Sequence, residues 1–195
     1  ILFLNLHIMH PIYTYIKNTL SGIYPDTETS ALAKWILTEL FQFSATELYT
    51  GKDMNFSTKE WEELEDILRR LKQREPLQYI LQEASFCGMS FHVEQGVLIP
   101  RPETAELVEL IVKENPGARH LLDIGTGSGC IAISLDQNLP DAEVESWDVS
   151  DEALAIASEN NKELDARVMF RRRDVLSDEL GATSCYDVLS AIHLI

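Results

Sequence analysis

Apolar residues in the first third of the chain recur at the spacing of a helix. They fall three or four positions apart in two runs, Leu32, Trp35, Ile36 and Leu40, and then Trp61, Leu64, Ile67, Leu68 and Leu71. Such spacing places apolar side chains on one face of each helix. Residues 1–74 contain no run typical of a strand. We therefore predict a helical bundle over residues 1–74, with its tryptophans in the core.

Polar residues mark where these helices begin and end. Ser44 with Glu47, and Ser57 with Glu60, match the S-x-x-E capping box, in which the two side chains satisfy free N–H groups at a helix start. Gly22, followed by Pro25, interrupts the first helical stretch. The acidic run at residues 60–66 is typical of a solvated helix face, although it also suits a basic partner.

The pattern changes in the second half of the chain. Short apolar runs at residues 121–124, 144–147, 168–170 and 186–189 alternate with helical segments. This alternation predicts an α/β fold with a parallel, Rossmann-like sheet. Ligands of such sheets bind at the carboxyl ends of the strands, and Gly125, Asp148 and Asp174 lie there.

A glycine-rich loop follows the first of these strands. It consists of Gly125, Thr126, Gly127, Ser128 and Gly129, and Asp123 precedes it. A dinucleotide-binding loop would have a third glycine at position 130, where this chain has Cys130. The G-x-G-x-G spacing instead resembles the first motif of the class I S-adenosylmethionine-dependent methyltransferases, in which Asp123 would face the methionine end of the cofactor. A tight turn with no ligand is the alternative.

The next strand ends in Asp148, about 20 residues after the glycines. A carboxylate at this place accepts hydrogen bonds from both ribose hydroxyls and repels a 2′-phosphate, so Asp148 is the predicted ribose ligand. Trp147 is either a neighbour of the adenine or a core residue.

Composition narrows the function classes. The chain has 195 residues, 45% of them hydrophobic, and a formal net charge of −16. This charge disfavours binding to a nucleic acid backbone and favours a basic protein surface. The basic run Arg171, Arg172 and Arg173 is expected to pair with nearby acids at a solvated edge.

Cysteines and the apolar start bear on location. Cys87, Cys130 and Cys185 form no C-x-x-C pair, so we expect neither a disulfide framework nor a zinc site. We therefore expect a cytoplasmic location. Residues 1–9 are apolar but too short to span a bilayer, and we expect no membrane partner.

Residues 75–100 are predicted to form a β-hairpin linker, because alternating apolar residues flank Gly88. Three motifs lie in and around it: R-E-P-L-Q-Y-I at 74–80, F-x-G-x-x-F-x-V at 86–93 and V-L-I-P-R-P-E-T at 97–104. Together with L-L-D-I-G-T-G-S-G at 121–129, they resemble the HemK/PrmC family. Those enzymes use S-adenosyl-L-methionine to methylate the side-chain amide of the glutamine in the Gly-Gly-Gln motif of class I peptide-chain release factors.

The resemblance implies a role for each part of the chain. Residues 1–74 would recognise the substrate, and 101–195 would form the cofactor-binding methyltransferase domain, truncated after its fourth strand. The residues implied to bind the cofactor are Asp123, Gly125, Thr126, Gly127, Ser128, Gly129, Asp148, Asp174 and Val175. Those implied to border the active site are Pro100, Arg101, Pro102 and Glu103, although Pro102 and Glu103 are also typical of a helix start.

The chain departs from the family where the catalytic residues are expected. In the family the fourth strand ends in Asn-Pro-Pro-Tyr, whereas here Ser190 is followed by Ala191, Ile192 and His193. An amide nitrogen is a poor nucleophile because its lone pair is delocalised, so this tetrapeptide supplies the positioning that gives rate. We expect missing sequence, assign no catalytic residue, and regard His193 as incidental rather than as a general base.

Three alternatives stay open. An adenine-amino methyltransferase acting on nucleic acid would also hold an NH₂ group with this tetrapeptide, but the acidic charge argues against it. A noncatalytic module would bind the cofactor or a release factor without turnover. A nicotinamide oxidoreductase is the least favoured, because of the glycine spacing.

Overall fold

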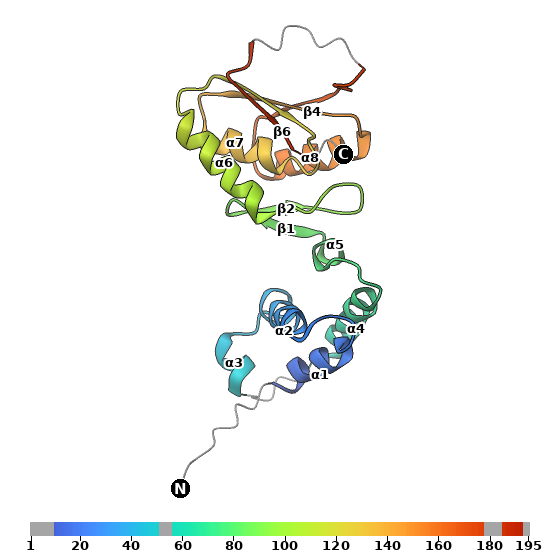
Figure 1. Cartoon of the computed structure of the whole chain (residues 1–195). Coiled ribbons are helices and arrows are strands. Elements are labelled where there is room, and N and C mark those ends of the chain that lie inside the picture. The colour runs from blue at the N-terminus through green and yellow to red at the C-terminus, as the bar shows by residue number, and fades with distance from the viewer. Residues whose placement is uncertain (1–9, 51–55, 178–184, 193–195) are drawn as a thin grey trace. The chain divides into compact units, whose positions relative to one another are not determined.

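The computed structural model describes residues 10–50, 56–177 and 185–192, and it divides into two compact units, residues 1–80 and 81–195. Residues 1–9 and His193, about which the sequence raised expectations, lie outside the described residues. Figure 1 shows the helices of the first unit and the sheet of the second.

The first unit is helical, as predicted. Its elements are α1 (Pro11–Leu20), α2 (Asp26–Trp35), the π-helix η1 (Ile36–Leu40), α3 (Ala45–Thr50), α4 (Thr58–Lys72) and α5 (Leu77–Leu81). Helix α1 ends before Gly22, and α2 begins directly after Pro25, as the sequence indicated. The core of this unit includes Ile16, Leu20, Ile36, Leu37, Leu64, Leu68 and Leu71, all at most 1% exposed.

Both predicted capping boxes are present. Ser57 accepts a hydrogen bond from the Glu60 N–H, and the Glu60 carboxylate accepts one from the Ser57 N–H. Ser44 and Glu47 make the same reciprocal pair at the start of α3. Because these bonds satisfy otherwise free N–H groups, they fix where α3 and α4 begin.

The expectation that the tryptophans of this unit lie in the core is wrong. Trp35 is 39% exposed and Trp61 is 37% exposed. Trp61 packs edge-on against the rings of Tyr15 and Phe56. Helical spacing therefore placed Trp61 on the apolar side of α4 but at its border, where an amphipathic ring stays half in solvent.

The second unit begins with an antiparallel hairpin of β1 (Glu83–Phe86) and β2 (Met89–His92). Its two-residue turn, Cys87 and Gly88, has φ values of 47° and 76°. Positive φ at both central positions is the turn geometry that suits the twist of paired strands. The predicted hairpin is therefore present, but it covers residues 83–92 rather than all of 75–100, because residues 77–81 form the helix α5.

A four-stranded parallel sheet follows, also as predicted. Its strands are β3 (His120–Ile124), β4 (Glu143–Asp148), β5 (Met169–Arg172) and β6 (Val188–Ala191), in the order β5-β4-β3-β6. The helices are α6 (Pro102–Glu114), α7 (Cys130–Asn138) and α8 (Asp151–Glu163). The main core joins α6 and α7 to the hairpin and the sheet through residues that include Phe86, Phe91, Val108, Ile133, Leu121 and Val144.

The basic run at the end of β5 is paired, as expected of a solvated edge. Arg171 forms an ion pair with Glu145, and Arg172 forms one with Asp151. The Arg173 guanidinium lies over the Trp147 ring, 5.7 Å from its centroid. None of the described helices is long and apolar enough to cross a membrane.

Candidate cofactor site

The glycine-rich loop connects β3 to α7 in a conformation that requires glycine. Gly125, Gly127 and Gly129 have φ values of 90°, 52° and 80°, a region that residues with a Cβ rarely adopt. Gly129 is also the N-cap of α7, where a Cβ would come within 3.0 Å of the Ala157 Cβ. The loop therefore turns sharply and brings the free N–H groups of the α7 N-terminus toward the carboxyl end of the sheet.

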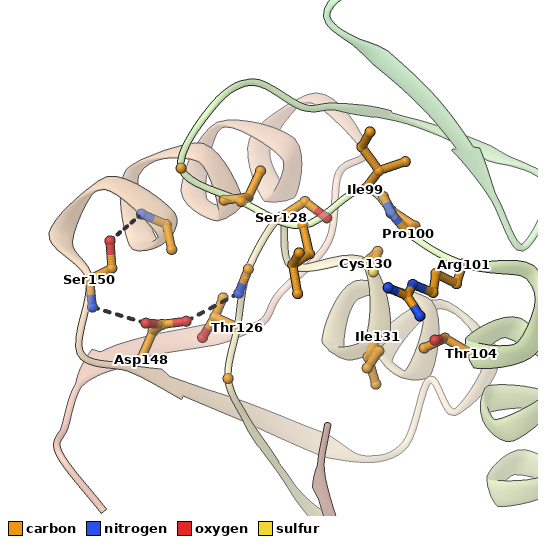
Figure 2. Close-up of a pocket in the computed structure, with 16 residues that line it drawn as sticks. Ile99, Pro100, Arg101, Thr104, Thr126, Ser128, Cys130, Ile131, Asp148 and Ser150 are labelled. Atoms are coloured by element: carbon orange, nitrogen blue, oxygen red, sulfur yellow. Dashed lines mark hydrogen bonds between the residues drawn. The ribbon is translucent and has the colours of Figure 1, made fainter. Parts of the chain in front are cut away.

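Asp148, the last residue of β4, lies beside this loop because β3 and β4 are neighbours in the sheet. Its Oδ2 accepts a 3.2 Å hydrogen bond from the Gly127 N–H, and its Oδ1 accepts a 2.9 Å bond from the Ser150 N–H (Figure 2). An ionised carboxylate offers about four acceptor positions. Asp148 therefore keeps acceptor capacity for a ligand while it is held in place by two backbone donors.

A pocket opens between the glycine loop and the segment that precedes α6. Figure 2 shows Asp148 and Thr126 on one side of it, and Ile99, Pro100 and Arg101 on the other. The residues that line it are Gly96, Val97, Leu98, Ile99, Pro100, Arg101, Thr104, Gly125, Thr126, Gly127, Ser128, Cys130, Ile131, Asp148, Ser150 and Ala153. The pocket thus combines a polar floor with an apolar wall, the usual character of a small-molecule site.

Comparison with known proteins agrees with this architecture. Residues 12–81 match the family described as the PrmC N-terminal domain, and residues 102–189 match the methyltransferase small domain. The release factor glutamine methyltransferase of Bacteroides thetaiotaomicron is 58% identical over 182 residues, which are 93% of this chain. The chain belongs to the HemK/PrmC family.

Two further likenesses complete the comparison. The release factor glutamine methyltransferase of Flavobacterium psychrophilum is 41% identical over 171 residues, which are 85% of this HemK/PrmC chain. The chain spans 65% of the Bacteroides protein and 60% of the Flavobacterium protein. Among solved structures, the ribosomal protein L11 methylase of Lactobacillus delbrueckii subsp. bulgaricus is 26% identical, with a TM-score of 0.41, over 51% of this chain and 50% of its own.

Seven of the residues that the HemK/PrmC likeness implies for the site line the pocket together. They are Pro100, Arg101, Gly125, Thr126, Gly127, Ser128 and Asp148. Gly129 acts through the turn that it permits. Pro102 and Glu103 lie in the first turn of α6, outside the pocket lining, in the helix-start positions that were their alternative interpretation. Their place at the border of an active site stays a prediction.

Asp123 lies below the loop rather than in the pocket lining. Its side chain is fully buried, and its two oxygens accept hydrogen bonds from Ser190 at 2.6 Å and Ser146 at 3.1 Å. The Thr126 hydroxyl is 2.8 Å from that of Ser146. Burial raises the pKa of Asp123 to about 6, although the two hydroxyl donors oppose the rise. Asp123 therefore supports the glycine loop from within the sheet, and its contact with a cofactor stays a prediction.

Asp174 and Val175 also lie outside the pocket lining. Asp174 accepts hydrogen bonds from the Leu176 N–H and the Ser177 hydroxyl, and these hold its pKa below the ordinary value. Val175 packs against the small core cluster of Leu122, Ile124 and Trp147. Their role beside the adenine stays a prediction, and Trp147, which is 7% exposed, is a core residue.

Several residues of the pocket are not among those that the sequence predicts. Gly96, Val97, Leu98 and Ile99 form part of one wall, and Thr104, Cys130, Ile131, Ser150 and Ala153 complete the lining. Ser150 could have been found from the sequence, because serine is a preferred residue at a helix N-cap. Its hydroxyl caps α8 by accepting a hydrogen bond from the Ala153 N–H. Burial raises the pKa of the Cys130 thiol to about 12, which favours its protonated form at neutral pH.

Proposed function

We propose that the pocket binds S-adenosyl-L-methionine and that the intact protein methylates the side-chain amide of the glutamine in the Gly-Gly-Gln motif of class I release factors. The observation that carries the proposal is the meeting of the glycine loop and Asp148 in one pocket, in a chain of the HemK/PrmC family. S-adenosylmethionine supplies a methyl group made electrophilic by its sulfonium.

The residues present fit this cofactor. Gly125 and Gly127 allow close approach of a ligand to the loop backbone, because no Cβ stands in the way. The remaining acceptor capacity of Asp148 suits the two ribose hydroxyls. Pro100 and Arg101 form the opposite wall, where the family resemblance places the border of the active site.

Methyl transfer to an amide forms an N–C bond as the C–S bond breaks, and the nitrogen then loses a proton to solvent. The transfer depends on holding the amide nitrogen in line with the methyl group, because the lone pair is delocalised over the carbonyl. We assign no catalytic residue within the described part of the chain. Its residues provide the cofactor half of the reaction, and the amide half is expected from the Asn-Pro-Pro-Tyr motif of the family.

The proposed partner is a protein rather than a nucleic acid. A net charge of −16 favours association with basic protein surfaces and opposes an approach to a phosphate backbone. The Bacteroides and Flavobacterium relatives carry the name release factor glutamine methyltransferase. Because release factors act on cytoplasmic ribosomes, the proposed location is the cytoplasm.

Two measurements test the proposal. Calorimetry of this chain with S-adenosylmethionine should show one-site binding, whereas NADH should not bind, and the reverse preference would contradict the cofactor assignment. The intact protein, given labelled S-adenosylmethionine and a release factor, should label the Gly-Gly-Gln glutamine and leave a Gln→Glu variant of that factor unlabelled. Cofactor binding with no transfer by the intact protein would favour a noncatalytic module, and labelling of DNA adenine would favour the nucleic acid alternative.

A further inference from the structure

Two separate segments of the chain form the walls of the pocket. One is the stretch of residues 96–101 that follows the hairpin strand β2, and the other is the glycine loop after β3. A ligand that contacts both walls needs a defined distance between them. A buried side chain from outside both segments hydrogen-bonds to the backbone of Ser128, in the glycine loop, and to the backbone of His92, which precedes the other segment.

That side chain is Asn160 on α8, which is 1% exposed. Its Oδ1 accepts a 2.7 Å hydrogen bond from the His92 N–H, and its Nδ2 donates a 3.0 Å bond to the His92 carbonyl. The second Nδ2 hydrogen serves the Ser128 carbonyl at 2.9 Å. Asn160 thus binds both polar groups of the residue that leads into one wall and a carbonyl of the other wall.

The arrangement admits only one orientation of the amide. If the oxygen and nitrogen were exchanged, the oxygen would face the carbonyls of His92 and Ser128, and the NH₂ group would face the His92 N–H. Two acceptor pairs and one donor pair would then meet in a buried place, where unsatisfied polar groups are costly. Asn160 is therefore matched to these three partners by both shape and polarity.

Other residues on the same face of α8 also serve the pocket. Ala153 lines it, and Ala157 lies against Gly129, so that Ala153, Ala157 and Asn160 follow one another at helical spacing. Small residues at 153 and 157 let the glycine loop approach the helix closely. Asn160 then adds the polar link that the two alanines cannot make.

We propose that Asn160 is the positioning residue of this pocket, which fixes the glycine loop relative to the wall of residues 96–101 so that S-adenosylmethionine contacts both at once. The proposal rests on the proposed function for the identity of the ligand, but the link itself belongs to the ligand-free protein. Asn160 is not part of the pocket lining and acts through the backbones of His92 and Ser128.

The test compares two neighbouring asparagines on α8. Asn160→Asp keeps the size of the side chain but replaces both N–H donors with an oxygen that faces two carbonyls. Asn161→Asp is the matched control, because the Asn161 side chain makes its hydrogen bonds with Val168, which precedes β5 and does not line the pocket. For each variant we would first measure the melting temperature. The Kd for S-adenosylmethionine and the amide hydrogen exchange of the ligand-free chain would then be measured at a temperature well below it. Asn160→Ala is the second variant, which loses the link without adding a carboxylate.

We expect both aspartate variants to melt earlier, and only the changes at Asn160 to raise the Kd, by at least tenfold, and to speed exchange in residues 96–101 and 125–129. An unchanged Kd in folded Asn160 variants, or an equal rise in Asn161→Asp, would overturn the proposal. Failure of both Asn160 variants to fold would also overturn it in favour of a purely structural role. If the unaltered chain does not bind S-adenosylmethionine, the cofactor assignment fails, and exchange in the two walls still decides the role of Asn160.

Discussion

The Ser190 hydroxyl donates a 2.6 Å hydrogen bond to the buried carboxylate of Asp123. The two residues are register partners in β3 and β6, and Ser146 of β4 is the partner of Asp123 on the other side. A row of three polar side chains therefore crosses the middle of the sheet directly below the glycine loop. Through the contact of Ser146 with Thr126, the row links the pocket to strand β6.

Asp123 is expected to make stability depend on pH. Burial raises its pKa from 3.8 to about 6, so the folded chain binds a proton more tightly than the unfolded chain does. The stabilisation from this group is complete below pH 3.8 and is lost as the pH rises through about 6. A shift of this size corresponds to about 3 kcal/mol.

Asp123→Asn should remove that dependence. Urea unfolding at several pH values should show the variant gaining on the unaltered chain by up to about 3 kcal/mol between pH 4 and pH 7. Ser190→Ala, which removes a donor to the carboxylate, should move the transition to higher pH. Parallel pH profiles for the unaltered chain and Asp123→Asn would disprove the raised pKa.

Gly129→Ala should destabilise the second unit. At φ 80° any Cβ is strained, and here it would lie 3.0 Å from the Ala157 Cβ and 3.1 Å from the Ile133 Cδ1. We expect a loss of about 2 to 4 kcal/mol in the free energy of unfolding. Gly117→Ala is the control, because a Cβ there meets nothing within 4 Å, and it should stay within about 0.5 kcal/mol of the unaltered chain.

Asp148→Asn should weaken S-adenosylmethionine binding at least tenfold. The amide cannot accept from both the Gly127 and the Ser150 N–H groups, and it offers the ribose hydroxyls fewer acceptor positions. Calorimetry would measure the change. Asp151→Asn provides a comparison, since Asp151 pairs with Arg172 at the surface and should leave the Kd unaltered. Equal affinities for Asp148→Asn and the unaltered chain would refute the ribose assignment.

Ser57→Ala should cost the helical unit about 1 kcal/mol, because the Glu60 N–H loses its capping acceptor. The same hydroxyl holds the pKa of Glu60 below its ordinary value, so that pKa should rise in the variant. Denaturant unfolding and an NMR titration would measure the two effects. Ser30→Ala, which removes only an exposed bond to the Asp26 carbonyl within α2, should change stability much less.

The sequence predicted the parts of the site that depend on local pattern. The glycine loop and Asp148 could be placed together because the carboxyl ends of adjacent parallel strands meet at one edge. The wall formed by Gly96 to Ile99 could not, since its position depends on a hairpin held by Asn160, one of several polar residues in α8 that no motif singles out. Burial of Asp123 depends on the register of three strands, which no local motif encodes.

The tryptophans show a different limit. The periodicity of apolar residues identifies the apolar side of a helix, but it does not show how much of that side the neighbouring helices cover. Trp61 lies on the expected side of α4, yet its indole contacts Tyr15 and Phe56 at a border that is open to solvent. Their exposure follows from packing between helices that are distant in sequence.

Asn160 reaches His92 and Ser128 through their peptide groups and uses neither side chain. Every amino acid except proline offers the same N–H and carbonyl, so mutation at positions 92 and 128 leaves this link intact. The frame of the pocket and its lining can consequently evolve separately. Descendants of such a protein can exchange the residues that meet a ligand while they inherit the distance between the walls.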